Sequence, residues 1–403
     1  MPALRTTETL THRATPVHGA THPGTTDTPA RSARRRVLLA PITVTPSKPL
    51  TPSHLKGLLW TDAMYRATAR LADADVTYRY SPTTYHPTEQ TLGFWEYLDR
   101  TRGDTDYAAL SEEQIGELYV GYRAEETRAG AAVLRPYADA VEHHGWVHPA
   151  SSRVLELWAA HYARLGMHDP GLLAHQPPEL GLEEMLEKLA GLGMCLDLRA
   201  YGSPVFLDAT RHGLPLRQIV DREGRPNYLA CALRELLPLA PRFDEIVLLY
   251  DRELEADYRL LERTLSAFGA TVCRVTLGRV PIDGTIRSAR HGDWHDHTAG
   301  ALLGRAAAEY DDPVLRLGMR LYFIAVLGPG QQQSFRHEVL RQSLTRAARL
   351  LSGGRETDPA PLPEVLARHR GDRLHVNPYR VTSSLLARHR PAPSRELLTA
   401  VYL

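Results

Sequence analysis

The residues best suited to chemistry lie at positions 45–56, which read Thr-Pro-Ser-Lys-Pro-Leu-Thr-Pro-Ser-His-Leu-Lys. They follow an apolar run at residues 37–42 and open a helical pattern. A strand that leads through such a turn into a helix offers free backbone N–H groups and the positive end of a helix dipole to an anion. This arrangement would put His54 beside a bound phosphate. The alternative is an ordinary loop with a polar surface histidine.

Two strands and a helix must position this segment. Residues 37–44 have the pattern of a buried strand, and residues 76–80 alternate and are aromatic, as strands are. Between them a helix is predicted, because apolar side chains recur on one face at Leu55, Leu58, Leu59 and Ala63. The sequence therefore predicts a βαβ unit that holds His54 at its first turn.

The strand pattern returns after a polar helical stretch at about residues 88–190, which we interpret as an insertion between two halves of a sheet. Strand signals follow at residues 204–207, 217–220, 245–250 and 271–277. Residues 246–249 are continuously apolar, as in a central parallel strand. We therefore predict an α/β fold with a doubly wound, parallel, Rossmann-like sheet and a ligand crevice at the carboxyl ends of its strands.

Two regions flank this predicted nucleotide-binding domain of residues 37–311. Residues 1–36 carry six arginines, are rich in Thr, Pro, His and Ala, and show no period, which predicts a disordered basic tail. Such a tail could contact nucleic acid or an acidic partner, or serve only as a spacer. Residues 312–403 have a helical pattern and are expected to form a short helical C-terminal region.

The overall composition excludes several classes of protein. The 403 residues are 43% hydrophobic and 24% charged, with a formal net charge of +1, so neither nucleic acid nor a membrane is demanded as a partner. No run of 18 apolar residues occurs. The cysteines, Cys195, Cys231 and Cys273, are far apart in apolar runs, which favours a reducing cytoplasm over a disulfide framework or a cysteine-type zinc site.

Several segments, taken in order, resemble the catalytic domain of class I aminoacyl-tRNA synthetases, most closely the arginyl-tRNA synthetase family. Residues 45–56 are similar to that family's Asn-Pro-(Thr/Ala)-(Lys/Gly)-Pro-Leu-His-Val-Gly-His-Leu-Arg, and residues 61–66 to its Gly-Asp-Ala-Leu-x-Arg. Residues 224–230 resemble its Gly-Thr-Pro-Thr-Tyr-x-x-Arg-Asp segment near the adenylate. Residues 286–293 stand in the place of its mobile Lys-Met-Ser-Lys loop.

The resemblance implies that ATP and Mg²⁺ bind at these motifs and that an amino acid is activated there. It assigns stabilisation of the phosphates to His54 and Thr51, and closure over the departing pyrophosphate to Arg287 or Arg290. Further contacts to the nucleotide would come from Ser47, Ser53, Lys56, Tyr228 and Ser288. Contacts to the amino acid or the ribose would come from Asp62, Tyr250, Asp251 and Glu253.

The chain departs from the family's motifs at three positions. Thr51 replaces the leading histidine of the first motif, and Ser53 replaces a glycine that lets adenine lie against the backbone. Ala289 replaces the second lysine of the mobile loop, so an arginine on either side of it would have to supply the cation. Thr51 can still donate a hydrogen bond to phosphate, and a protonated His54 would neutralise developing charge.

A cluster of metal-ligand residue types lies in and after the loop. Imidazole and carboxylate suit zinc or manganese. However, histidines at i and i+2 diverge on a helix and line up only on a strand, so we expect a loop that touches phosphate rather than a metal site. The cluster consists of His291, Asp293, His295, Asp296 and His297.

Our functional hypothesis is a ligase that forms an aminoacyl adenylate and passes the acyl group to an acceptor outside translation. The amino acid could be arginine-like, and the acceptor a small molecule, a peptide or a tRNA-derived group, as in specialised metabolism such as antibiotic biosynthesis. The reason is that only about 75 to 90 residues follow the catalytic region, where the family adds a large helical tRNA-reading domain. The alternatives are a catalytically degenerate paralogue that binds or regulates, and tRNA aminoacylation with a shortened C-terminal domain.

Overall fold

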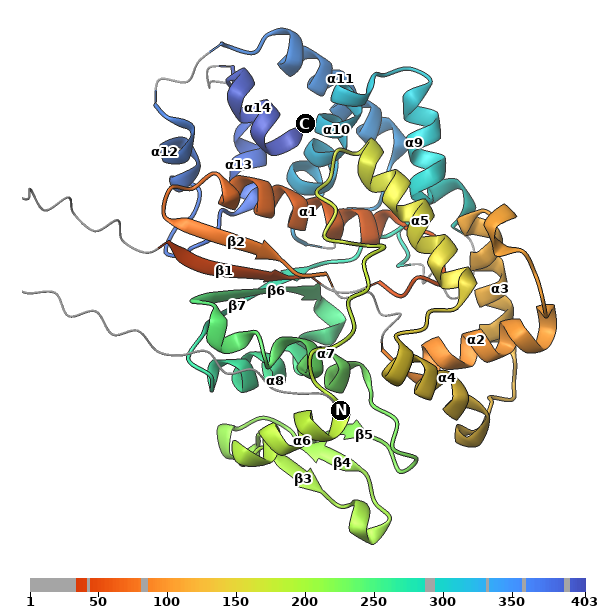
Figure 1. Ribbon diagram of the computed structural model, residues 1–403. Helices are drawn as coiled ribbons and strands as arrows, with labels where there is room; N and C mark the ends of the chain where they lie inside the picture. The colour runs from red at the N-terminus through yellow and green to blue at the C-terminus, as the bar shows by residue number, and fades with distance from the viewer. Residues whose placement is uncertain are drawn as a thin grey trace, which may run out of the picture. The chain divides into compact units, whose positions relative to one another are not determined.

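In the described part of the chain, four parallel strands form the central sheet (Figure 1). Their order is β2-β1-β6-β7, with β1 paired in parallel to both β2 and β6. This confirms the predicted α/β class and its parallel sheet. The strands are β1 (Arg35–Ala40), β2 (Ala74–Tyr78), β6 (Glu245–Asp251) and β7 (Thr271–Leu277).

The computed structural model describes most of the chain from Arg34 onward, and these residues form one compact unit. The described residues are 34–41, 44–80, 86–286, 294–330, 333–356, 360–387 and 392–403. The tail predicted for residues 1–36 lies outside them, except for its last three residues. Arg35 and Arg36 do not belong to a tail, because both pair with β2 as the first residues of β1.

The sheet is covered on both faces, which explains the continuous apolar runs of β1 and β6. Val37 and Leu39 pack against α1 (Pro52–Ala69), while Leu38 and Ala40 face the other side. That side is covered by α7 (Tyr228–Leu236) and α8 (Glu255–Ser266), below the sheet in Figure 1. The strand β1 ends at Ala40 because Pro41 has no N–H to continue the ladder.

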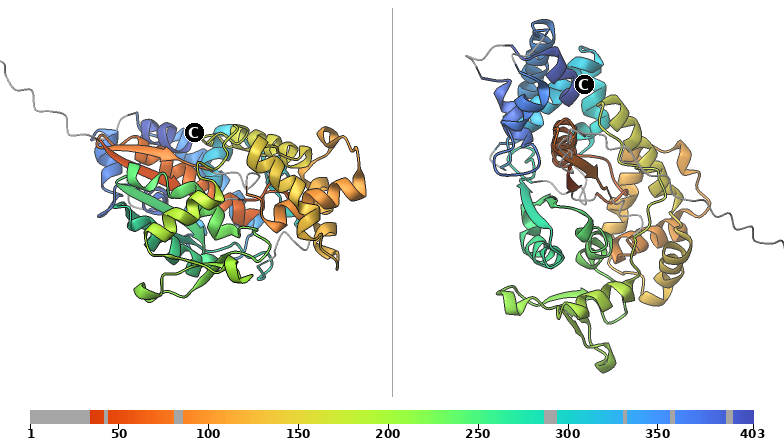
Figure 2. Two further views of the ribbon diagram at one scale, coloured as in Figure 1. Left: turned by 60° about the horizontal axis from the view of Figure 1, so that its bottom comes forward. Right: turned by 60° about the vertical axis from the view of Figure 1, so that its left-hand side comes forward.

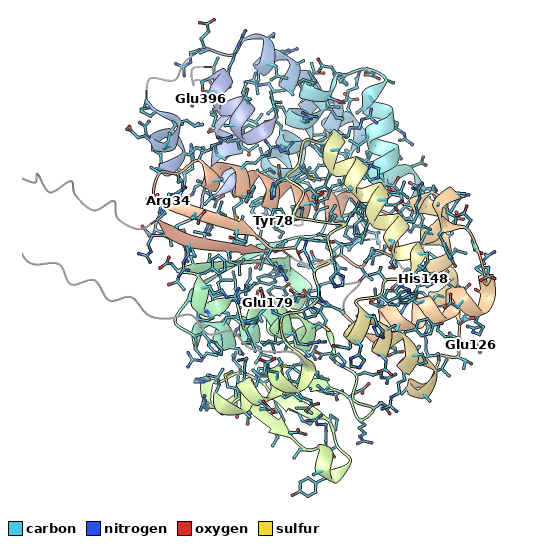
Figure 3. All side chains as sticks on the ribbon, in the orientation of Figure 1. Arg34, Tyr78, Glu126, His148, Glu179 and Glu396 are labelled. Atoms are coloured by element: carbon cyan, nitrogen blue, oxygen red, sulfur yellow. The ribbon has the colours of Figure 1, made fainter. Side chains whose placement is uncertain are left out.

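The segment between β2 and β6 is a helical insertion followed by a small second sheet. Figure 2 shows α2 to α5 gathered at one end of the parallel sheet, while α6 packs beside the small sheet, and Figure 3 labels His148, which caps α5. The insertion helices are α2 (Glu89–Arg102), α3 (Glu112–Ala124), α4 (Ala131–His144), α5 (Pro149–Arg164) and α6 (Leu182–Gly191).

Two strands that we predicted among those of the parallel sheet lie elsewhere. Residues 204–207 and 217–220 contain β4 (Val205–Leu207) and β5 (Arg217–Val220), which form an antiparallel sheet with β3 (Cys195–Asp197). The connection from β4 to β5 is too short for a parallel crossover, which needs a dozen or more residues. The apolar pattern of a strand does not show which strand it pairs with, so the sequence analysis could not separate the two sheets.

The C-terminal region is helical, as the fold class predicts, and it packs on the α1 side of the sheet (Figure 1). A π-helical turn at Leu321–Val326 continues α10 and contacts α1. Among the described helices none is long and apolar enough to cross a membrane. The helices of this region are α9 (Ala299–Ala307), α10 (Asp312–Arg320), α11 (His337–Ser352), α12 (Leu362–Ala367), α13 (Pro378–Ser384) and α14 (Arg395–Tyr402).

Candidate functional site

A cavity of about 620 Å³ lies at the carboxyl ends of β1 and β6. The helix α1 leads from β1 to β2 and α8 leads from β6 to β7, so the chain leaves these two neighbouring strands in opposite directions. Ligands of open α/β sheets bind at such a reversal of strand order. The crevice therefore lies where the sequence analysis predicts it, with the first turn of α1 in its wall.

The first turn of α1 fixes the ring of His54. Thr51 caps the helix, and its backbone N–H donates a hydrogen bond of 3.0 Å to Nδ1 of His54. The nitrogen that accepts this bond carries no proton, so the proton of the neutral ring lies on Nε2. His54 lines the cavity and can donate this N–H to a ligand.

His54 is neutral in this structure, which corrects the protonated histidine of the sequence interpretation. Burial, with the nearby charges of Lys48 and Arg279 acting in the same direction, lowers the pKa of His54 from 6.5 to about 3. A third positive charge beside these two cations would be repelled. The ring therefore serves a ligand as a hydrogen-bond donor rather than as a cation.

The residue that replaces the family's glycine does not project freely into the cavity. The Ser53 hydroxyl accepts a hydrogen bond of 2.9 Å from the backbone N–H of Val280, which ties α1 to the chain after β7. One turn later, Gly57 also lines the cavity, and a Cβ added there would meet no atom within 4 Å. The open floor of the cavity thus lies at Gly57, a position that sequence reasoning missed.

Besides Lys48, the cavity has a second cationic residue, Arg279, which the sequence analysis did not identify. It follows β7 and lines the cavity, where Nε lies 3.0 Å from Asp251 and Nη2 lies 3.0 Å from Glu253. Burial raises the pKa of Asp251, while Arg279 acts in the opposite direction. Asp251 and Glu253 therefore lie in the cavity wall, where both are bound to Arg279. A basic residue directly after a predicted strand of the crevice is the signal that could have found it.

Tyr228 and Tyr250, both predicted as site residues, each contact Tyr258. The Tyr228 hydroxyl lies 2.7 Å from that of Tyr258, whose ring stacks on Tyr250 with the ring centroids 4.3 Å apart. Both Tyr228 and Tyr250 line the cavity, and the phenol of Tyr250 is bonded to Glu255 and Arg274, which are partly exposed. The hydroxyls of both tyrosines are therefore held by neighbouring side chains, while their rings remain at the cavity wall.

Lys56 lies outside the walls of this cavity, which corrects its assignment to the nucleotide. Its Nζ donates to the backbone carbonyls of Gly278 and Gly330 at 2.9 and 2.7 Å, and burial lowers its pKa to about 8 against the effect of Asp251. On α1 the cavity is lined by positions 53, 54, 57, 58 and 61, which recur three and four residues apart and so share one face. Position 56 falls on another face of this helix.

Asp62 and Ser47 also lie outside the cavity walls. The carboxylate of Asp62 is 1% exposed, forms an ion pair with the buried Arg320 and accepts a hydrogen bond of 2.8 Å from the backbone N–H of His168. These contacts correct its assignment to the substrate and give it a structural role. The Ser47 hydroxyl is buried and has no hydrogen-bond partner among the described residues.

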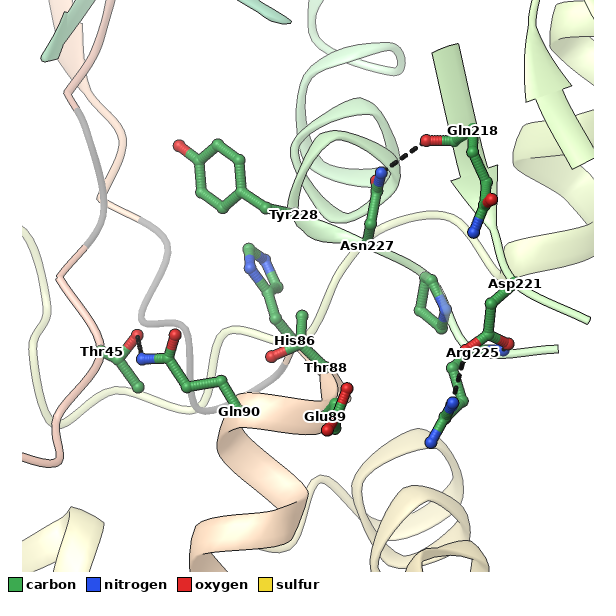
Figure 4. Close-up of a pocket in the computed structure, with 11 residues that line it drawn as sticks. Thr45, His86, Thr88, Glu89, Gln90, Gln218, Asp221, Arg225, Asn227 and Tyr228 are labelled. Atoms are coloured by element: carbon green, nitrogen blue, oxygen red, sulfur yellow. Dashed lines mark hydrogen bonds and ion pairs between the residues drawn. The ribbon is translucent and has the colours of Figure 1, made fainter. Parts of the chain in front are cut away.

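Two smaller cavities adjoin the first one at Tyr228. One has a volume of about 350 Å³ and lies between α2 and the segment that leads from β5 to α7 (Figure 4). The other, of about 30 Å³, lies behind Tyr228 and Pro41. Tyr228 lines all three cavities. Both smaller cavities are lined by residues far apart in the sequence, so the sequence did not reveal them.

The loop residues Arg287, Ser288, Ala289 and Arg290 lie outside the described residues, as do His291 and Asp293. The rest of the metal-type cluster forms a single helical turn, His295–His297, in which Asp296 is bound to Arg305. In the part of the chain that the structure describes, no group of three His, Cys, Asp or Glu residues could hold a metal ion.

No protein-family model matches the chain, and no curated protein sequence matches it. Among solved structures, it is similar to the arginyl-tRNA synthetase of Thermus thermophilus, with a TM-score of 0.57 and 16% identity over 81% of this chain and 66% of that one. The chain thus spans less than two thirds of the Thermus enzyme.

Two further synthetases give lower scores. The arginyl-tRNA synthetase of Plasmodium falciparum has a TM-score of 0.43 and 11% identity over 80% of this chain and 52% of that one. A Mycobacterium tuberculosis methionyl-tRNA synthetase, in complex with methionyl-adenylate, has a TM-score of 0.44 and 10% identity over 91% and 81%. The likeness to the Thermus enzyme establishes a class I, arginyl-tRNA-synthetase-like fold, as the motifs predict.

Proposed function

We propose that the protein activates an amino acid with ATP and transfers the acyl group to an acceptor outside translation, such as a small molecule, a peptide or a tRNA-derived group. The carboxylate of the amino acid attacks the α-phosphate of ATP, and the bond to pyrophosphate breaks to leave an aminoacyl adenylate. The observation that carries this proposal is the convergence of His54, Lys48 and Arg279 on one cavity at the strand reversal.

The first turn of α1 supplies the groups that suit the phosphates. Its backbone N–H groups and the Nε2–H of His54 are hydrogen-bond donors, and Lys48 and Arg279 add positive charge. Donors fixed before the reaction stabilise charge as it develops. If Mg²⁺ enters with ATP, the carboxylates of Asp251 and Glu253 would be the groups that hold it, and the ion would neutralise phosphate charge.

The acyl group would lie at Tyr228, on the other side of the strand ends. Tyr228 comes from α7, which covers the face of the sheet opposite α1. The cavity of about 350 Å³ opens beside it, so an acceptor could approach the acyl carbon from there (Figure 4). Amide side chains that suit a small polar acceptor line it: Gln90, Gln218 and Asn227. In this proposal the protein works in the cytoplasm, where its three free cysteines stay reduced.

The test is exchange of labelled pyrophosphate into ATP with each amino acid, with and without total tRNA. We expect exchange with at least one amino acid, and a loss of roughly 100-fold or more in the His54→Ala variant. Arg70→Ala is a matched control, since this exposed residue at the end of α1 lies outside the cavity. Absence of both exchange and ATP binding with the full panel of amino acids would refute the proposal.

A catalytically degenerate binding protein is the second candidate. It is favoured by Thr51 and Ser53 in the first motif and by the pairing of Arg279 with two carboxylates. Such a protein would show no thermal shift at millimolar Mg-ATP, whereas the enzyme would be stabilised, because a ligand that binds only the folded state raises the melting temperature. It would show no pyrophosphate exchange with any amino acid.

A further inference from the structure

We propose that Arg79 and Glu235 make the site selective for an amino acid with a small, uncharged side chain. This inference rests on the proposed function, because it concerns the amino acid that would be activated. It replaces the arginine-like substrate suggested by the motif resemblance. Both residues line the cavity of about 30 Å³ behind Tyr228.

This side cavity lies where the substrate's side chain would point. It shares Tyr228 and Pro41 with the main cavity, so it adjoins the main cavity at the acyl end proposed above. If the phosphates bind at the first turn of α1, the amino acid extends toward α7. Its side chain then meets the gap between Tyr228 and the end of β1.

Glu235 is the anionic group in this side cavity, and the protein supplies its positive partner. The carboxylate is 3% exposed, and Nη2 of Arg79 lies 3.4 Å from its Oε2. On the other side, Nε2 of His86 lies 3.7 Å from Oε1. A buried carboxylate needs such a partner. The guanidinium of Arg79, which comes from the end of β2, therefore holds the place that a cationic substrate side chain would need.

The small volume of the side cavity, together with the Nε–H group of Arg79, favours a short substrate side chain. A cavity needs at least about 10 to 15 Å³ to hold one water molecule, so the volume of about 30 Å³ admits a group as small as a hydrogen, a methyl or a hydroxymethyl. The Nε of Arg79 is buried and has no hydrogen-bond partner among the described residues. A hydroxyl oxygen could accept from it. We therefore assign glycine, alanine and serine as the substrate class.

The experiment compares the wild type with Arg79→Ala. Pyrophosphate exchange is measured with glycine, alanine, serine, arginine and lysine, and thermal unfolding is followed with methylguanidinium chloride as a probe of the vacated space. The wild type should prefer a small amino acid over arginine by roughly 100-fold in kcat/KM. Arg79→Ala should lose that preference and be stabilised by methylguanidinium, whereas the wild type and the Arg70→Ala control should not be stabilised.

Glu235→Gln added to Arg79→Ala should remove the stabilisation, since the probe then lacks its carboxylate. If the Ala variant does not fold, Arg79→Gln, which has no charge, should discriminate less against arginine than the wild type, while Arg79→Lys should retain the preference.

The possible outcomes separate this inference from the proposed function. Exchange that is fastest with arginine or lysine in the wild type would overturn the inference and support amino-acid activation. Exchange with no amino acid would refute activation, and the methylguanidinium measurement would then decide alone. Stabilisation of Arg79→Ala that Glu235→Gln reverses supports the assigned pocket, and its absence overturns it.

Discussion

The backbone N–H of Thr51 donates a hydrogen bond of 3.0 Å to Nδ1 of His54, three residues along the same helix turn. This bond orients the ring and keeps its single proton on Nε2. It also satisfies one of the backbone donors that a helix leaves open at its start. His54 thus serves both the fold of α1 and the chemistry proposed for the cavity.

These two roles can be separated by substitution. His54→Gln keeps a side chain that can accept from the N–H of Thr51, whereas His54→Ala does not. We expect the Ala variant to lose about 1 kcal/mol of unfolding free energy and the Gln variant to lose less. Pyrophosphate exchange should fall by roughly 100-fold or more in both variants. Exchange retained in His54→Gln would mean that the imidazole N–H is dispensable.

The pH dependence of stability provides a second prediction for His54. Its pKa is lowered from 6.5 to about 3, so the folded protein binds fewer protons here than the unfolded chain between these values. The contribution of His54 is therefore fully present above pH 6.5 and is lost as the pH falls toward 3. Urea denaturation at pH 7.5 and 5.0 should show a larger loss for the wild type than for His54→Gln. An equal loss in both would contradict the lowered pKa.

The parallel sheet could be predicted because its two central strands, β1 and β6, are buried on both faces and have continuous apolar runs. The same pattern says nothing about partners, so β4 and β5 were recognised as strands but assigned to the wrong kind of sheet. Their pairing is decided by a short connection and by the helices that cover them. The start of β1 was missed because Arg35 and Arg36 are charged, so the sequence analysis assigned them to the basic tail rather than to a strand.

The candidate site could be predicted where a residue follows directly from the position of a strand end or a helix start. His54, Asp251 and Tyr228 are of this kind, and all three line the cavity. Lys56 and Asp62 were misplaced because motif spacing does not state which helix face meets the crevice. Arg79 and Glu235, 156 residues apart, meet only through tertiary packing.

Asp62 is predicted to act on stability rather than on substrate. Removing one partner of a buried ion pair leaves an uncompensated charge and typically costs about 3 to 5 kcal/mol. Asp62→Ala should therefore lower the unfolding free energy by this amount, measured by urea denaturation. The matched control is Glu338→Ala, which removes the exposed pair with Arg341 and should cost less than about 1 kcal/mol. Equal losses in the two variants would show that the Asp62 pair is not buried in solution.

Arg279 is predicted to bind the phosphates after leaving its carboxylate partners. Arg279→Ala should reduce exchange by roughly 100-fold, because a charged hydrogen bond at the developing charge is lost. Arg279→Lys should recover part of the rate, since it keeps the charge but loses the planar fork. The control is Arg217→Ala, because Arg217 lines the same cavity but pairs with Asp257 at 2.8 Å. A similar loss in the control would mean that total charge, rather than Arg279 itself, sets the rate.

Gly57 provides a test of the cavity floor that does not depend on catalysis. A Cβ at this position would meet no atom within 4 Å, so Gly57→Ala should stabilise α1 by about 1 kcal/mol through helix propensity alone. Gly57→Phe should fill the cavity and abolish the thermal shift caused by Mg-ATP, while the variant itself remains folded. Gly304 of α9 is the matched control, since it is exposed and equally open but lines none of the three cavities. If Gly57→Phe keeps the same Mg-ATP shift as Gly304→Phe, the nucleotide does not lie over this turn of α1.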